Sequence, residues 1–291
     1  MPPHLSSPVF SWAEQKDESF ELIGVDFTSA PSARKPITAA RGRLSGNILK
    51  FEALENFPDW PSFEKLLQRP GPWLGAFDFP FGLPREGVFS LGWPLEWAAL
   101  VRHCHHLGKT AFRAALDTDR QSRAKGSRYP HRATDRPAVS HSPFKLVNPP
   151  VGLMFLAGAP RLLAAGLHLP GQHSGDPMRI ALEAYPGLLA RAIATRPYKS
   201  DELRKQTSER AEARRRILTA LKSGKHPLCI SLQCSAADSN ALIADARGDQ
   251  LDAVLALIQA GWAWQQRKRN FGLPDVIDPI EGWILGAPYS L

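Results

Sequence analysis

Three short apolar segments of this 291-residue chain each end in a carboxylic acid. Residues 22–25 lead into Asp26, residues 73–77 into Asp78 and residues 180–182 into Glu183. Apolar runs of this length, bounded by turn-forming residues, predict buried β-strands. A carboxylate at the end of a buried strand is unfavourable unless a cation compensates its charge. The chain is therefore expected to form a sheet whose strand ends carry several acids that need a cation.

The order of apolar and turn-forming segments predicts an α/β fold. Ser45-Gly46-Asn47 is a hairpin turn signal, so the first strands are expected to form an antiparallel meander. The predicted strands cover residues 21–27, 36–42, 47–53, 73–77 and 180–183. The predicted helices cover residues 61–67, 94–107, 110–116, 151–166, 201–222 and 249–263, and one more begins at Pro186. These elements indicate a mixed central sheet flanked by helices, in a single domain over residues 20–291 with insertions.

The ends and the cysteines of the chain suggest a cytoplasmic protein. Residues 1–19 contain Pro and Ser without periodicity, which predicts a flexible N-terminal arm and no signal peptide. No apolar run reaches the length of about 18 residues that spans a membrane. Three cysteines, an odd number, predict free thiols and no disulfide partner.

The charge of the chain favours a polyanionic partner, DNA or RNA. Lys and Arg outnumber Asp and Glu by 36 to 28, a net charge of +8, and such an excess attracts nucleic acid without specifying it. A basic insertion is predicted near residues 117–145, where periodicity is lost. Residues 214–216 and 267–269 are further basic clusters, and the former also fits the basic end of a helix. The predicted nucleic-acid contacts within the insertion are Arg123, Lys125, Arg128, Arg132 and Lys145.

Two more acids, Asp249 and Asp252, open a late predicted helix. Each acid alone has an ordinary interpretation, since Asp26 and Asp78 fit turn caps and Asp249 fits a helix N-cap. Converging carboxylates repel one another, and a divalent cation is their usual partner. We therefore predict Mg²⁺ or Mn²⁺ at Asp26, Asp78, Asp249 and Asp252. Two such ions would support hydrolysis of a phosphodiester.

The acids also belong to a wider set of sequence segments. The set comprises Ile23-Gly24-Val25-Asp26, residues 77–84, Glu183-Ala184-Tyr185-Pro186, Pro197-Tyr198-Lys199, residues 248–253 and Glu281-Gly282-Trp283-Ile284. In this order, over about residues 21–286, the segments resemble the domain-of-unknown-function family 429. That family is regarded as a predicted nuclease group with a ribonuclease H-like fold.

The resemblance implies a site like that of Holliday-junction resolvases, with acids on the first strand, on a later central strand and on a late helix. Asp26 would bridge two metal ions, Asp78 would take the second acidic position, and Asp249 or Asp252 would supply the helix ligand. Glu183 would be a further catalytic strand-end acid, although its counterpart is not defined. Lys199 would neutralise charge on the phosphate, or it is a solvated lysine before a helix.

Other functions stay open on the sequence alone. Asp26-Phe27-Thr28-Ser29 is similar to the phosphate loop of sugar-kinase and actin-like phosphotransferases, but no second copy of that domain is apparent. A nucleotide hydrolase is a related possibility. A non-catalytic nucleic-acid-binding module would be expected to have lost some acids, and all the expected positions are acidic. His103-Cys104-His105-His106 lacks the ligand spacing of a zinc site.

Overall fold

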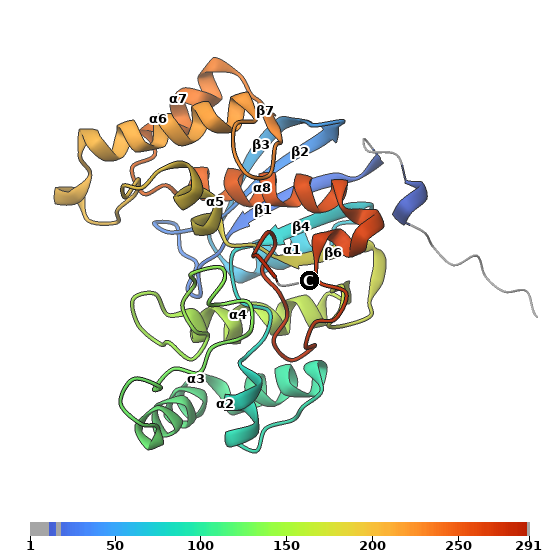
Figure 1. The fold of residues 1–291 in the computed structure, drawn as a ribbon, viewed down its shortest axis with the longest axis vertical. Coiled ribbons are helices and arrows are strands. Elements are labelled where there is room, and N and C mark those ends of the chain that lie inside the picture. Colours follow the sequence, from blue (N-terminus) through green and yellow to red (C-terminus); the bar gives the residue numbers. More distant parts are fainter. Residues whose placement is uncertain (1–11, 16–18, 290–291) are drawn as a thin grey trace, which may run out of the picture.

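The computed structural model describes residues 12–15 and 19–289, and most of the predicted arm over residues 1–19 lies outside them (Figure 1). Its central feature is a seven-stranded sheet. The strands are β1 (Glu21–Asp26), β2 (Ile37–Ser45), β3 (Ile48–Phe57), β4 (Trp73–Phe77), β5 (Leu167–His168), β6 (Asp176–Glu183) and β7 (Ser231–Gln233). The strand order across the sheet is β5-β6-β4-β1-β2-β3-β7.

The sheet is mixed, as predicted. β1, β2 and β3 form the antiparallel meander, with Ser45 and Ile48 paired at its turn. β4 and β6 run parallel to β1, so β1, β4 and β6 finish at the same end of the sheet. The short outer strands β5 and β7 are parallel to their neighbours. Asp26, the last residue of β1, and Asp78, the first residue after β4, are thereby brought to one end.

Helices cover both faces of the sheet (Figure 1). One face packs on α5, α6, α7 and α8, and the other packs on α1, α3 and α4, each over its own apolar core. The helices are α1 (Trp60–Leu67), α2 (Arg85–Ser90), α3 (Trp97–Ser122), α4 (Val151–Ala164), α5 (Pro186–Ile193), α6 (Ser208–Ser223), α7 (Ala236–Ala244) and α8 (Asp249–Gln265). Short 3-10 turns are η1 (Trp12–Glu14), η3 (Leu203–Lys205) and η4 (Arg267–Gly272). The α/β prediction is confirmed.

Three predicted helices differ from the structure in ways that bear on function. The helices predicted at 94–107 and 110–116 form one element, α3, interrupted at Gly108, whose φ of +68° is not helical. The helix predicted from residue 201 begins instead at Ser208, with Thr207 as its N-cap. The residues before it therefore form an irregular segment, which carries Tyr198 and Lys199. The elements α2, α7, β5 and β7 were not among the predicted ones.

The basic insertion is partly helical, because α3 continues to Ser122. Residues 123–150 follow without helix or strand. Cys104, Cys229 and Cys234 are all free, as predicted. Within the described part of the chain, no helix has the length and apolar character needed to span a membrane.

Candidate functional site: an acidic cluster at the end of the sheet

Asp26 and Asp78 lie side by side at the end of two parallel strands. Val25 pairs with Phe77, so the two aspartates occupy the next position on β1 and just beyond β4. The Asp78 backbone N–H donates to Val25 O at 2.9 Å, which extends the ladder past the strand. Successive strand residues face opposite sides of a sheet. Val25 and Phe77 belong to the core opposite α8, so both aspartates face the α8 side.

Gly24 allows α8 to approach β1 closely. A Cβ at this position would lie 2.0 Å from Leu257 N and 2.2 Å from Ala253 O, so only glycine fits beneath the helix backbone. Asp252 and Asp249 are on the turn of α8 that precedes Ala253 and lie near Asp26, because both charges act on it. The close packing at Gly24 therefore brings acids from the first strand and from the late helix together.

Asp245, which the sequence analysis did not consider, contributes to capping α8. Its carboxylate accepts the Gln250 N–H at 2.9 Å and the Arg247 N–H at 3.2 Å. Gly248 is the N-cap residue of the helix, with φ +78°, and Asp249 is the first helical residue rather than the cap. Asp249 and Asp252 therefore do not cap the helix, and both belong to the acidic cluster. The signal was available in the sequence as an acid just before the Gly-Asp start of the helix.

The carboxylates of the cluster destabilise one another in their charged forms. Burial, followed by repulsion from Asp252, raises the pKa of Asp26 well above its ordinary value, and Asp249 and Asp78 add to the effect. Burial and Asp252 also raise the pKa of Asp78 to about 7. Burial raises the pKa of Asp249 as well. Among the described residues, none donates a hydrogen bond to the side chains of Asp26, Asp78 or Asp249, so these acids lack the donors that normally satisfy buried carboxylates.

Asp252 differs from its neighbours because it has two partners. It is fully buried, its Oδ1 accepts the Tyr198 hydroxyl at 2.5 Å, and its Oδ2 forms an ion pair with Lys199 Nζ. Burial opposes the charge of Lys199, but attraction by Asp252, Tyr198 and Asp26 raises the pKa of its ammonium well above the ordinary value. Lys199 is thus the cation that the cluster holds in this structure. The sequence signal for Tyr198 was limited to its place in the segment Pro197-Tyr198-Lys199.

The segment that carries these two partners is anchored by its backbone. Arg214 Nη1 donates to Tyr198 O at 2.7 Å, and Ser200 N donates to Ala246 O at 3.1 Å. Arg214 itself is buried in the middle of α6. It makes this contact with the backbone of Tyr198 and does not lie at the basic end of the helix. The Lys199 stem lies over Gly248, whose absent Cβ would be 2.7 Å from Lys199 Cβ.

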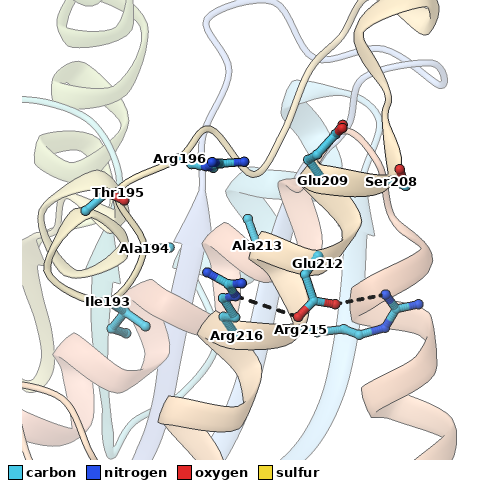
Figure 2. Close-up of a pocket in the computed structure, with 10 residues that line it drawn as sticks. All are labelled: Ile193, Ala194, Thr195, Arg196, Ser208, Glu209, Glu212, Ala213, Arg215 and Arg216. Carbon is cyan, nitrogen blue, oxygen red and sulfur yellow. Dashed lines mark hydrogen bonds and ion pairs between the residues drawn. The ribbon is translucent and has the colours of Figure 1, made fainter.

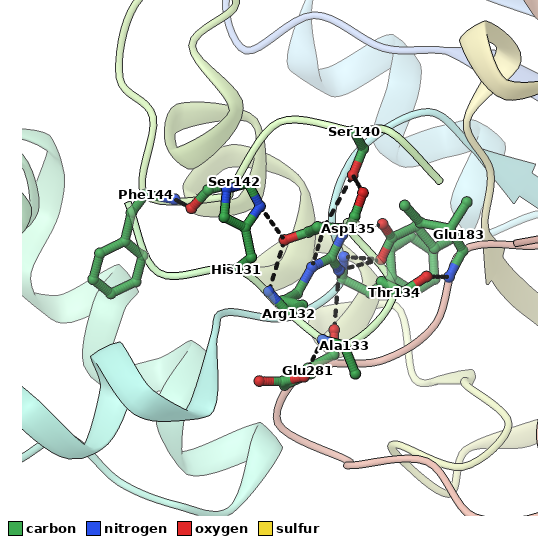
Figure 3. A network of polar contacts seen from close by, with 12 residues as sticks. His131, Arg132, Ala133, Thr134, Asp135, Ser140, Ser142, Phe144, Glu183 and Glu281 are labelled. Atoms are coloured by element: carbon green, nitrogen blue, oxygen red, sulfur yellow. Dashed lines mark hydrogen bonds and ion pairs between the residues drawn. The ribbon is translucent and has the colours of Figure 1, made fainter. Parts of the chain in front are cut away.

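Glu183 is placed on the opposite side of the sheet from the two aspartates. It pairs with Phe77, one residue before Asp78, and strand alternation therefore turns it away from α8. Arg132 Nη1 and Nη2 each donate to one of its oxygens at 2.7 Å (Figure 3). Phe81 N also donates to Glu183, at 2.9 Å. The structure does not bring Glu183 into the cluster, although its charge adds to the raised pKa of Asp78.

Arg132 is the centre of a buried network that fixes residues 123–150 to the end of the sheet. The side chain is 2% exposed, and it donates to Asp135 Oδ1 and to Glu281 O as well as to Glu183 (Figure 3). Glu281 accepts the N–H groups of Ala133 and Arg85 at 2.7 and 2.8 Å. This burial leaves the Arg132 guanidinium no free surface for a phosphate, which differs from its predicted role.

The other predicted nucleic-acid contacts divide into paired and open residues. Arg123 forms ion pairs with Asp119 and Glu86, which neutralise much of its charge. The Lys145 Nζ lies 3.5 Å from each ring nitrogen of His141. Lys125 and Arg128 are exposed. Of the five predicted contacts, these last two are the most accessible to a polyanion.

A surface pocket of about 560 Å³ lies between the end of α5 and the start of α6 (Figure 2). Arg215 and Arg216 in its wall both pair with Glu212, so their charge is partly neutralised. None of the acids of the cluster lines it. Its polar lining includes Ser208 and Glu209, but the pKa of Glu209 is lowered rather than raised, so the acidic cluster remains the stronger candidate site.

The donors of the cluster suit a hard divalent cation. Carboxylate oxygens are the ligands that Mg²⁺ and Mn²⁺ prefer, and three of the carboxylates accept no hydrogen bond from the described residues. No group of three or more His, Cys, Asp or Glu side chains within residues 12–15 and 19–289 is, however, arranged to hold a metal ion. Metal binding by the acidic cluster therefore stays a prediction.

The chain matches no protein-family model, no curated protein and no solved structure. The resemblance to the domain-of-unknown-function family 429 therefore stays a prediction as well. The geometry of the cluster carries the functional argument.

Proposed function

We propose that this protein is a metal-dependent phosphodiester hydrolase that acts on nucleic acid, with a ribonuclease H-like scaffold. The observation that carries the proposal is the convergence of Asp26, Asp78 and Asp249, three carboxylates with raised pKa values and without donors among the described residues, beside Asp252. Perturbed acids grouped in this way are typical of functional sites. Their placement on the first strand, after a central strand and on a late helix agrees with the site that the family resemblance implies.

Mg²⁺ or Mn²⁺ would be held by Asp26, Asp78, Asp249 and Asp252. When bound, such ions lower the pKa of water and stabilise charge on a phosphodiester. The protein supplies the alignment: the β1–β4 ladder fixes the two strand acids, and Gly24 fixes the distance of α8 from them. Tyr198 orients Asp252 through its hydroxyl, and Lys199 provides a positive charge for the phosphate.

The basic surface and the free thiols fit this function. The net charge of +8, with exposed Lys125 and Arg128 on residues 123–150, favours a polyanionic substrate. Three free cysteines fit a reducing compartment such as the cytoplasm.

The test is a cleavage panel of single-stranded DNA, duplex DNA, RNA, RNA–DNA hybrid and a four-way junction, each with Mn²⁺ and with EDTA. We expect cleavage of at least one substrate with Mn²⁺, no cleavage with EDTA, and none with Asp26→Asn. Asp117→Asn is the matched control, because Asp117 pairs with Arg120 at 2.9 Å on α3, which packs on the other face of the sheet. Salt-sensitive binding without cleavage by wild type and Asp26→Asn alike would favour a binding module instead.

A further inference from the structure

Lys199 occupies the place in the cluster where positive charge is most needed. Its Nζ contacts the fully buried Asp252, and its charge lowers the pKa of both Asp26 and Asp78 against the repulsion of the other acids. One ammonium thus stabilises three carboxylates that come from two strand ends and a helix. It contributes the compensation that a bound divalent cation would otherwise provide.

The Lys199 stem reaches solvent, while its ammonium lies against the buried Asp252 and its backbone is held by hydrogen bonds. The Lys199 side chain is 43% exposed, while the Asp252 side chain that it contacts is fully buried. Arg210 Nη1 donates to Lys199 O, and hydrogen bonds from Arg214 and Ser200 anchor the neighbouring backbone. The Gly248 backbone beneath the stem offers no side chain to clamp it. Rotation of the exposed stem can therefore withdraw Nζ from Asp252 without movement of the chain.

We propose that Lys199 is a displaceable counterion, which neutralises the acidic cluster in the metal-free protein and leaves Asp252 when a divalent cation binds. This role rests on the proposed metal site and adds a function for Lys199 before catalysis. The cation must compete with the Lys199 ammonium for Asp252, so Lys199 lowers the affinity of the site for metal. In the metal-free protein the same ammonium reduces the repulsion between the carboxylates. The ammonium that is released stays beside the site.

Mn²⁺ titration by calorimetry, without nucleic acid, tests the competition. In Lys199→Met the competing charge is absent, and we expect Mn²⁺ to bind about tenfold more tightly than to wild type. Lys199→Arg keeps the charge and should bind Mn²⁺ no more tightly than wild type. Lys205→Met is the control, because Lys205 lies in the same segment and pairs with Glu202 instead. Its affinity should be unchanged.

A second measurement uses the wild-type protein and does not depend on how well the variants fold. Acylation of individual lysines, followed by mass spectrometry, should be several times faster at Lys199 in Mn²⁺ than in EDTA, because loss of the Asp252 partner exposes the amine and lowers its proton affinity. Lys205 should react equally under both conditions.

The outcomes separate the two proposals. Mn²⁺ binding to wild type with equal or weaker binding to Lys199→Met, or with unchanged Lys199 acylation, overturns the counterion role and leaves the metal site standing. Absence of Mn²⁺ binding in wild type and Lys199→Met alike overturns the metal site and the counterion role together.

Discussion

Two groups of carboxylates lie at the same end of the sheet, and they differ in their partners. On the side opposite α8, Glu183 and Asp135 surround the buried Arg132, which donates to both. On the α8 side, Asp26 and Asp78 accept no hydrogen bond from the described residues. Burial raises the pKa values of both, as it also raises the pKa of Glu183, so the two groups differ in their partners. The comparison teaches that partners, and not acidity or burial alone, separate the acids that hold the fold from the acids that we propose as metal ligands. The first group should therefore govern stability and the second should govern activity.

The largest expected effect is on catalysis. Asp78→Asn should lower cleavage by about 10²–10³-fold, since removal of one preorganised electrostatic group has an effect of this size. The folded state without metal should be at least as stable as wild type, because the substitution removes a repelling charge. Cleavage rates and urea unfolding of the same preparations check both statements. Full activity in Asp78→Asn would place the reaction elsewhere.

On the other side of the sheet the effect should fall on stability. Arg132→Met leaves Glu183 and Asp135 buried without their cation, and we expect a loss of about 3–5 kcal/mol in the free energy of unfolding. Arg128→Met is the control on the same segment, and as an exposed change it should stay within about 0.5 kcal/mol of wild type. Denaturant unfolding measures the difference. Equal stability of the two variants would mean that the buried network does not support the fold.

The pH dependence of stability should reveal the repulsion between carboxylates in the acidic cluster. The pKa of Asp78 is about 7 in the folded protein, against 3.8 ordinarily, with burial, Asp252, Lys199 and Glu183 acting on it. Between these values the folded state holds a proton that the unfolded state has released, so stability falls as pH rises. In EDTA, Asp78 should lower the free energy of unfolding by about 1.4 kcal/mol for each pH unit inside this window. Above about pH 7 it should cause no further loss. Asp78→Asn should remove this contribution, and an unchanged pH profile in the variant would contradict it.

The smallest expected effect concerns the one acid of the cluster that has a neutral donor. Tyr198→Phe removes the hydroxyl that donates to Asp252 Oδ1, and we expect a loss of about 1–3 kcal/mol in stability, as for other hydrogen bonds to charged groups. Tyr185→Phe is a matched control, because the Tyr185 hydroxyl bonds to Arg191 at an exposed position. Thermal unfolding in EDTA compares the two. An equal shift for both would show that the Asp252 bond is not special.

The sequence predicted the strands that end in acids but not the side of the sheet that each acid faces. Asp78 and Glu183 both follow an apolar run, yet the pairing of Phe77 with Glu183 puts them one residue out of step. A shift of one residue reverses the side that a side chain faces. That register depends on contacts between strands that are far apart in the sequence, and no local pattern contains it.

Two other differences have the same long-range origin. Local composition predicted a basic insertion near residues 117–145, whereas Arg132 is buried because it pairs with Glu183, 51 positions away in the sequence. Asp201 and Glu202 have the form of a helix start, but bonds from Ser200 to Ala246 and from Arg214 to Tyr198 hold this region irregular. The α8 helix, by contrast, was predictable because its apolar periodicity is local.

Mn²⁺ binding measured by calorimetry on wild type, Asp26→Asn and Glu183→Gln tests the central claim most directly, because the three proteins sample both sides of the sheet. We predict that wild type and folded Glu183→Gln bind Mn²⁺ with similar affinity, and that Asp26→Asn loses most of the binding. Equal binding by wild type and Asp26→Asn, or no binding by wild type, would contradict the assignment of the acidic cluster as a metal site.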